Sequence, residues 1–326
     1  MEKKIAVLGG GTGISTVLKG LKDYTKDISA IVSMSDDGGG SGILREELKI
    51  LPPGDVRRCL VALSNTDEVL KELIEYRFNS GTLKNQNVGN ILIAALADIN
   101  GSFDKALMEM SSVFNITGRV LPVTFDETHL VAEFSSKDKV VGESYIPKMC
   151  YRLDTSIEKM SMIPHYPKAN KEALKAIDEA DIVIIGPGSL YTSIIPNFLV
   201  AGINEALEKT KAKRIYIGNV MTQRGETIGY SLSDHVKAIS KHMKKDLIDI
   251  VIANNKKAPE NYYEYYFNKE DSKPIFVTDD DRKYFNDRNI KLIEGDFIDI
   301  EDRLVRHDGH KIGRAINELF CCNNSL

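Results

Sequence analysis

The sequence has few of the features that build small secreted or membrane-bound folds. Its 326 residues include only four cysteines, two of them adjacent (Cys321 and Cys322), so neither a disulfide framework nor a cysteine metal site is expected. No apolar run approaches the roughly 18 residues of a membrane span. The apolar run after the initial "MEKK" is too short for a signal peptide and favours a first strand. We therefore expect a reduced, cytoplasmic protein without a membrane span.

An excess of positive charge is also absent. The chain has 43 Lys and Arg against 47 Asp and Glu, a net charge of −4, so it offers no general basic surface for nucleic acid. Its six histidines show no metal-ligand spacing, which argues against a zinc site. We expect no nucleic-acid partner, although a local phosphate pocket is compatible with this composition.

What the sequence does contain is an alternation of apolar strand and helix patterns. "KKIAVLGG" and "DISAIVSMS" are typical of buried strands, and "ISTVLKGLKDY" between them has helical spacing, which predicts a βαβ unit with a parallel sheet. Later strands are expected in "ADIVIIGPGS", "RIYIGNV", "LIDIVIANN" and "KPIFVTD", whereas "DDDR" at 279–282 is expected to be a solvated loop. We predict one three-layer, Rossmann-like, doubly wound α/β domain over 1–326. It has a mainly parallel sheet and a small antiparallel β insertion at about 117–165.

The loop "GGGTGIS" at 9–15 lies between the first strand and the first helix. Glycines let backbone N–H groups approach a ligand, and a helix N-terminus attracts a phosphate. Gly10, Gly11, Thr12 and Gly13 are therefore candidate phosphate-binding residues. The loop is not a full dinucleotide fingerprint, because Ile14 occupies the place of its last glycine, and it lacks the Lys-Ser/Thr of a P-loop. A tight turn without a ligand is the alternative.

Two adjacent acids, Asp36 and Asp37, follow the second strand in "VSMSDDGGGSG". Adjacent carboxylates repel unless a cation or a set of hydrogen-bond donors relieves them. A Mg²⁺ ion that bridges carboxylate and phosphate oxygens would do so, with Asp55 as a third acid. Mg²⁺ is the one cofactor that the sequence suggests. The alternatives are ribose recognition by Asp36 and a surface Asp-Gly turn.

Further polar residues follow other strands or begin helices. Arginine offers a planar fork for phosphate, and at most one of Arg57 and Arg58 is expected to face a ligand. Asn87 is expected to cap a helix, with Asn90 available for a ligand. The candidates for phosphate or sugar binding are Ser41, Arg45, Asn90, Gly186, Gly188, Ser189, Leu190, Tyr191, Asn219 and Thr222. Because parallel strands end at one edge of a sheet, we expect these loops to share one pocket.

Long motifs of the chain resemble a known family. "GGGTGIS", "VSMSDDGGGSGILREEL", "LPPGDVRRCLVALS", "NVGNILIAAL", "GPGSLYTSIIPN" and "MTQRGETIGYSLSDHV" are similar to the bacterial gluconeogenesis factor family (YvcK-type). That family shares a superfamily with the 2-phospho-L-lactate transferases (CofD-type). The resemblance extends over nearly the whole chain.

The resemblance implies a cytoplasmic protein that binds UDP-sugars, notably UDP-N-acetylglucosamine. It also implies a role in growth on gluconeogenic carbon sources and in cell shape and wall integrity. Residues 10–13 would hold the pyrophosphate, and Asp36, Asp37 and Asp55 match acidic positions around the metal and phospho-donor of the transferases. The transferase branch has Asn-Thr-Gly where this chain has Ser33-Met34-Ser35, and one further acid of its pattern is missing.

Three functions follow as hypotheses. The first is a nucleotide-sugar-binding regulator with a protein partner in cell-wall or carbon metabolism, and a homo-oligomer is compatible with it. The second is a Mg²⁺-dependent phosphotransferase in which Asp37 or Asp55 takes the proton from the acceptor hydroxyl. The third, a dinucleotide-binding oxidoreductase, leaves the paired acids and the second glycine loop unexplained.

Overall fold

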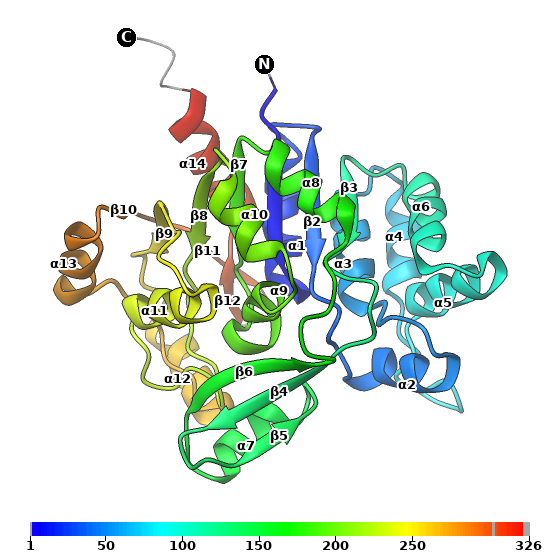
Figure 1. Ribbon diagram of the computed structural model, residues 1–326, viewed down its shortest axis with the longest axis horizontal. Helices are drawn as coiled ribbons and strands as arrows, with labels where there is room; N and C mark the ends of the chain where they lie inside the picture. Colours follow the sequence, from blue (N-terminus) through cyan, green and yellow to red (C-terminus); the bar gives the residue numbers. More distant parts are fainter. Residues whose placement is uncertain (1, 302–303, 322–326) are drawn as a thin grey trace.

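The computed structural model describes residues 2–301 and 304–321. Its centre is a seven-stranded sheet in the order β10-β9-β8-β7-β1-β2-β3, and every pair in it is parallel (Figure 1). The strands are β1 (Ile5–Gly9), β2 (Ile28–Val32), β3 (Arg119–Pro122), β7 (Ile182–Ile185), β8 (Lys213–Ile217), β9 (Ile250–Asn254) and β10 (Lys291–Gly295). The predicted doubly wound α/β fold is confirmed.

Strand β1 lies at the point where the strand order reverses. It pairs with β2 on one side and β7 on the other, so Ile5 faces both Ile28 and Ile182. The chain runs outward from β1 through β2 and β3, and outward in the opposite direction from β7 through β8 to β10. All five residues of β1 are buried, which explains why the strand reads as a continuous apolar run. Ligands of open α/β sheets bind beyond the carboxyl ends of strands at such a switch point.

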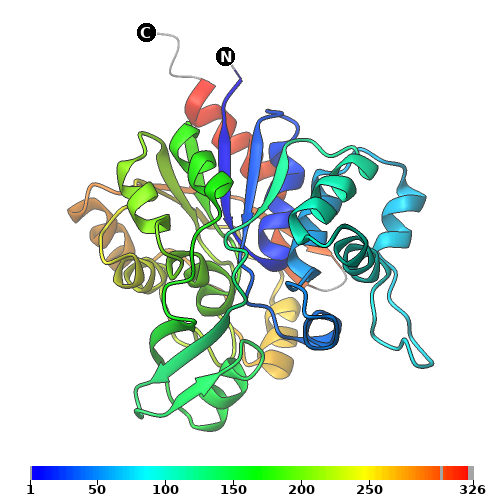
Figure 2. The ribbon, with the colours of Figure 1, turned by 45° about the vertical axis from the view of Figure 1, so that its right-hand side comes forward.

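Helices cover both faces of the sheet (Figures 1 and 2). On one face α1, α3 and α14 pack together; on the other lie α8, α9, α10, α11 and α13. The helices of the two faces are α1 (Gly11–Leu21), α3 (Gly54–Leu63), α14 (Gly309–Cys321), α8 (Lys171–Glu179), α9 (Ile195–Phe198), α10 (Ile203–Lys209), α11 (Leu232–Met243) and α13 (Asp279–Asp287). The remaining helices are α2 (Gly39–Leu48), α4 (Glu68–Glu75), α5 (Val88–Asn100), α6 (Phe103–Val113), α7 (Ile146–Arg152) and α12 (Glu260–Glu270), with a π-helical segment η1 (Leu190–Ile194) before α9. No helix in the described chain is both long and apolar enough to span a membrane.

A small antiparallel sheet lies beyond the carboxyl edge of the main sheet, at the bottom of Figure 1. Its strands are β4 (His129–Phe134), β5 (Lys139–Val141) and β6 (Ile157–Ile163), with α7 between β5 and β6. We call residues 129–163 the insertion. The β-rich segment expected from 117 begins with a strand of the main sheet, because β3 pairs in parallel with β2.

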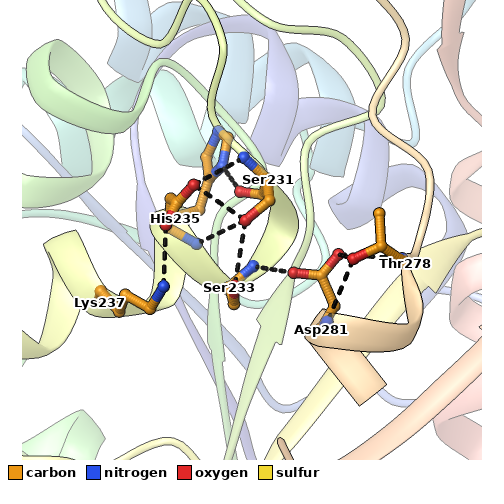
Figure 3. A network of polar contacts seen from close by, with 7 residues as sticks. Ser231, Ser233, His235, Lys237, Thr278 and Asp281 are labelled. Carbon is orange, nitrogen blue, oxygen red and sulfur yellow. Dashed lines mark hydrogen bonds and ion pairs between the residues drawn. The ribbon is translucent and has the colours of Figure 1, made fainter. Parts of the chain in front are cut away.

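Two local predictions were wrong. "KPIFVTD" is no strand; it has only an isolated bridge between Pro274 and Met221. Residues 279–282 are the first turn of α13, not a loop, because the side chain of Thr278 accepts the N–H of Asp281 and the carboxylate of Asp281 accepts that of Thr278. Asp281 also accepts the N–H of Ser233 at 2.8 Å and so ties α13 to α11 (Figure 3).

The sequence patterns also missed strands near the C-terminus. The edge strand β10 was not predicted, nor was the antiparallel pair of β11 (Ile298–Glu301) and β12 (Leu304–His307). These segments are only partly apolar, as expected for strands at the margin of a fold. The closing helix α14 was predicted and packs on α1.

Candidate functional site

Loops from separate parts of the chain meet at the switch point and enclose a cavity of about 550 Å³. We call it the switch-point cavity. The predicted site residues that line it are Gly10, Gly11, Thr12, Gly13, Asp36, Ser41, Asp55, Asn90, Gly188 and Ser189. They follow β1, β2 and β7 or begin helices α2, α3 and α5. The convergence expected of a parallel sheet thus brings most of these candidates to one place.

Three helices point their N-termini at this cavity. Helices α1, α2 and α3 begin at Gly11, Gly39 and Gly54, all of which line it. Their N-cap residues make no side-chain capping hydrogen bond. Each helix end carries partial positive charge and first-turn N–H groups that have no partner within the helix, so the three together favour an anionic ligand.

The glycine loop also packs tightly against the loop after β7. A Cβ placed on Gly13 would lie 2.6 Å from the carbonyl carbon of Pro187 and 3.0 Å from the backbone nitrogen of Gly188. Only glycine permits this approach. The two loops that flank the switch point therefore form one continuous backbone surface.

The two adjacent acids have different surroundings. Asp36 lines the cavity, and its Oδ1 accepts the N–H of Gly38 at 2.9 Å. Asp37 does not line the cavity; its carboxylate accepts the N–H groups of Glu143 at 2.9 Å and Ser144 at 2.8 Å. Backbone donors on each side relieve the repulsion that a shared cation was expected to relieve. The geometry thus favours Asp36 over Asp37 as a metal or catalytic group.

Both arginines of α3 line the cavity, where only one was expected. Arg58 donates to Asp55 Oδ1 at 2.9 Å. Arg57 is buried and donates from Nε to Oδ1 of Asn90 at 3.1 Å. Asn87 caps α5 as predicted. A third cation, Arg77, reaches the cavity from beyond α4.

Other candidates lie outside the cavity. The guanidinium of Arg45 is buried and donates to the carbonyl of Thr128, so it braces the loop before β4. Tyr191 donates its backbone N–H to Glu226 and pairs its hydroxyl with Tyr230, and Thr222 accepts the N–H of Lys273. The residues that do not line the cavity are Asp37, Arg45, Gly186, Leu190, Tyr191, Asn219 and Thr222.

Asn219 lies in a smaller cavity of about 250 Å³ that adjoins the first. Thr12, Gly13 and Gly188 line both cavities, so the glycine loop forms a wall that is common to the two cavities. Asn219 donates from Nδ2 to the carbonyl of Gly188 at 2.9 Å. Its buried Oδ1 has no hydrogen-bond partner among the described residues.

Comparison with known proteins places the chain in a family. A family model described as 2-phospho-L-lactate transferase CofD matches residues 5–298. The gluconeogenesis factor of Bacillus subtilis (strain 168) is 42% identical, over 98% of each chain. The gluconeogenesis factor of Halalkalibacterium halodurans is 41% identical, over 97% of this chain and 96% of that one. The chain belongs to the CofD family, among the gluconeogenesis factors.

The fold agrees with that membership. A crystal structure of a UPF0052 family member from Bacillus halodurans has a TM-score of 0.91 and 41% sequence identity to this chain. The similarity covers 96% of this chain and 99% of that chain. The predicted resemblance to gluconeogenesis factors and to CofD proteins is confirmed.

In this gluconeogenesis factor homologue, one acid that the sequence patterns missed lines the cavity, and a second binds Thr192, which lines it. Glu143, from the turn before α7, lines the cavity. Glu226 is buried, and its carboxylate accepts the backbone N–H of Tyr191 and the hydroxyl of Thr192, both at 3.0 Å. Glu143 does not follow a strand of the main sheet, so the rule that located the other residues could not find it. Glu226 lies in the loop after β8 but was not singled out. The one available signal for Glu143 was the polar turn "GES" within the β-rich segment.

Burial and repulsion from neighbouring carboxylates raise the pKa values of two acids in the cavity, Asp55 and Glu143. Burial, reinforced by the charge of Asp36, raises the pKa of Asp55 to about 6, although Arg58 and the N–H of Gly11 oppose the rise. Burial and the charges of Asp36 and Asp37 raise the pKa of Glu143 to about 8. Titratable groups with such shifts in a cavity are typical of functional sites.

The acids fit Mg²⁺ only together with a ligand. Among residues 2–301 and 304–321, no group of three or more His, Cys, Asp or Glu side chains is arranged to hold a metal ion. Mg²⁺ usually takes one or two carboxylates plus phosphate oxygens. Asp36 and Asp55 meet that requirement if a phosphate occupies the cavity.

Proposed function

We propose that the switch-point cavity binds the diphosphate of a UDP-sugar, notably UDP-N-acetylglucosamine. We further propose that the protein is a cytoplasmic regulator that senses this ligand. The observation that carries the proposal is the convergence of three helix N-termini and three arginines, Arg57, Arg58 and Arg77, on one cavity. Backbone N–H groups and guanidinium groups are the donors that diphosphates require.

The size of the site supports a ligand larger than phosphate. A cavity of about 550 Å³ lies within the range of about 300–1,000 Å³ typical of small-molecule sites. The adjoining cavity of about 250 Å³ shares the glycine loop with it. A ligand whose diphosphate lies on this loop therefore has room for one substituent on each side. A nucleoside and a sugar are such a pair.

Family membership supports a regulatory role. The relatives that match over nearly their whole length are named gluconeogenesis factors. We infer that ligand binding reports precursor supply to a protein partner in cell-wall or carbon metabolism, and so serves growth on gluconeogenic carbon sources and the maintenance of cell shape. The absence of one acid of the transferase pattern favours this role over catalysis.

A ligand-dependent melting series tests the proposal. UDP-N-acetylglucosamine should raise the melting temperature, because a ligand at 100 times its Kd adds about 2.7 kcal/mol to the free energy of unfolding. NAD at equal concentrations is the control. A clear shift with NAD and none with the UDP-sugar would favour the dinucleotide-binding hypothesis instead.

The second candidate is a Mg²⁺-dependent phosphotransferase that resembles 2-phospho-L-lactate transferase. It is favoured by the position of Asp36 in the cavity and by Asp55, whose pKa of about 6 allows it to accept a proton near neutral pH. Bound Mg²⁺ would neutralise the diphosphate. Asp36 would hold the ion, and Asp55 would take the proton from the acceptor hydroxyl.

Calorimetry with and without Mg²⁺ separates the two candidates when it is combined with an assay for product. The Asp36→Asn variant should abolish any Mg²⁺ enhancement of nucleotide binding. If Mg²⁺ enhances nucleotide binding by the variant as much as by the unmodified protein, Asp36 does not hold the ion and serves only the turn at Gly38. Mg²⁺-dependent formation of a new phosphodiester by the unmodified protein would establish the transferase.

A further inference from the structure

The turn before α7 is fastened to the loop that follows β2. Asp37 supplies both acceptors: one carboxylate oxygen accepts the N–H of Glu143 at 2.9 Å, and the other accepts the N–H of Ser144 at 2.8 Å. These partners lie more than one hundred residues away along the chain, on the insertion. Hydrogen bonds from N–H groups to a carboxylate are stronger than neutral ones. Asp37 therefore anchors the insertion at the rim of the cavity.

The shape of the turn agrees with this anchor. Gly142 has a φ of +108°, and a Cβ there would lie 3.0 Å from Oδ2 of Asp37 and 2.9 Å from the ring of Tyr145. Any other residue at position 142 would crowd the carboxylate of Asp37, to which the N–H groups of this turn donate. The far side of α7 is held as well, because the guanidinium of Arg224 lies 3.5 Å from the ring centre of Tyr151. The position of Glu143 is thus set from two directions.

This arrangement brings a carboxyl group into the cavity beside the groups that favour a phosphate. The helix N-termini, Arg57 and Arg58 supply the positive potential of the cavity, and Glu143 enters it from the insertion as an acid. A phosphate next to Glu143 would gain no ion pair, because the protonated carboxyl is neutral and the ionised one repels it. A hydroxyl is a suitable neighbour, since a carboxyl group accepts hydrogen bonds from it without a charge conflict.

The two ends of a UDP-sugar differ in the groups that they offer. A hexose presents many hydroxyl donors, whereas a uracil edge alternates one donor with two acceptors. Asn219 lines the adjoining cavity, and an amide, which carries both donors and an acceptor, matches the uracil edge better than a carboxyl group does. We therefore propose that Glu143 recognises the sugar hydroxyls of the bound nucleotide-sugar and that Asp37 is the residue that positions it.

This assignment rests on the proposed binding of a UDP-sugar, and calorimetry with UDP and UDP-N-acetylglucosamine as separate probes tests it. Glu143→Ala should raise the Kd for UDP-N-acetylglucosamine at least tenfold and leave the Kd for UDP within a factor of two. Glu143→Gln, which keeps the shape of the side chain, should have a smaller effect in the same direction. Glu133→Gln, on the same insertion with its carboxylate paired to Lys139, is the matched control and should change neither Kd.

Asp37→Ala tests the positioning role. It should produce the same selective loss as Glu143→Ala, and the double variant should lose no more than either single one, because both act through one contact. Additive losses in the double variant would overturn the positioning role. Melting curves of each variant establish that it is folded.

The remaining outcomes are distinguishable. Equal losses for UDP and UDP-N-acetylglucosamine in Glu143→Ala, or no loss for either, would overturn the assignment of Glu143 while leaving the proposed function intact. An unmodified protein that binds neither probe would overturn the proposed function and this assignment with it.

Discussion

Arg58 donates a hydrogen bond from Nη1 to Oδ1 of Asp55 at 2.9 Å, three residues away on α3. Asp55 also accepts the N–H of Gly11, in the glycine loop. The carboxylate of Asp55 thus uses the donors that a phosphate on this loop would use. A diphosphate must compete with Asp55 for them, unless a proton or Mg²⁺ neutralises the acid.

Arg58→Gln should weaken the binding of UDP and of UDP-N-acetylglucosamine by the same factor. A hydrogen bond to a charged group contributes about 1.5–3 kcal/mol, so calorimetry should find a loss of roughly tenfold to a hundredfold. Arg314→Gln, on the exposed surface of α14, removes the same charge at a distance and should leave both affinities unchanged. Unaltered binding by Arg58→Gln would remove this arginine from the diphosphate site.

Gly13→Ala should abolish binding by forcing the two loops of the switch point apart. The added methyl group would lie 2.6 Å from the carbonyl carbon of Pro187, which is backbone and cannot rotate away. Gly81→Ala is the control, because a Cβ there meets open space and only its φ of +73° opposes the change, at about 1–2 kcal/mol. Retained affinity in a folded Gly13→Ala protein would contradict the close packing of these loops.

The buried carboxyl of Glu226 should give the protein a measurable pH dependence. Burial raises its pKa from 4.5 to about 7 in the folded protein. Between these two pH values the folded state keeps a proton that the unfolded chain has released, so the free energy of unfolding falls as the pH rises. Glu226→Gln should remove this component, which is at most about 3 kcal/mol. Denaturant unfolding at pH 5 and pH 8 measures it, and identical pH dependence in the two proteins would contradict the raised pKa.

The sequence predicted the parts of the site that follow from the main sheet. Consecutive apolar residues identify buried parallel strands, and parallel strands must end at one edge, so the loops after β1, β2 and β7 were expected to meet. Gly10, Asp36 and Ser189 lie in the cavity for this reason. A single sequence could not separate the roles of Asp36 and Asp37, because the partners of Asp37 lie on the insertion.

The contribution of the insertion could not be predicted for the same reason. Strand patterns in 129–163 indicate a β unit but not where that unit docks. Glu143 reaches the cavity only because the insertion folds over the carboxyl edge. The start of α13 was a different kind of error: Thr278 and Asp281 have the spacing of a helix cap, and that signal was present but outweighed by three adjacent acids.

Amide hydrogen exchange of the protein with and without UDP-N-acetylglucosamine tests the central claim most directly. If N–H groups of the glycine loop, the start of α2 and the loop after β7 bind the diphosphate, exchange should slow at residues 10–13, 38–41 and 188–193. Slowed exchange elsewhere at saturating ligand, with these three segments unchanged, would contradict the account.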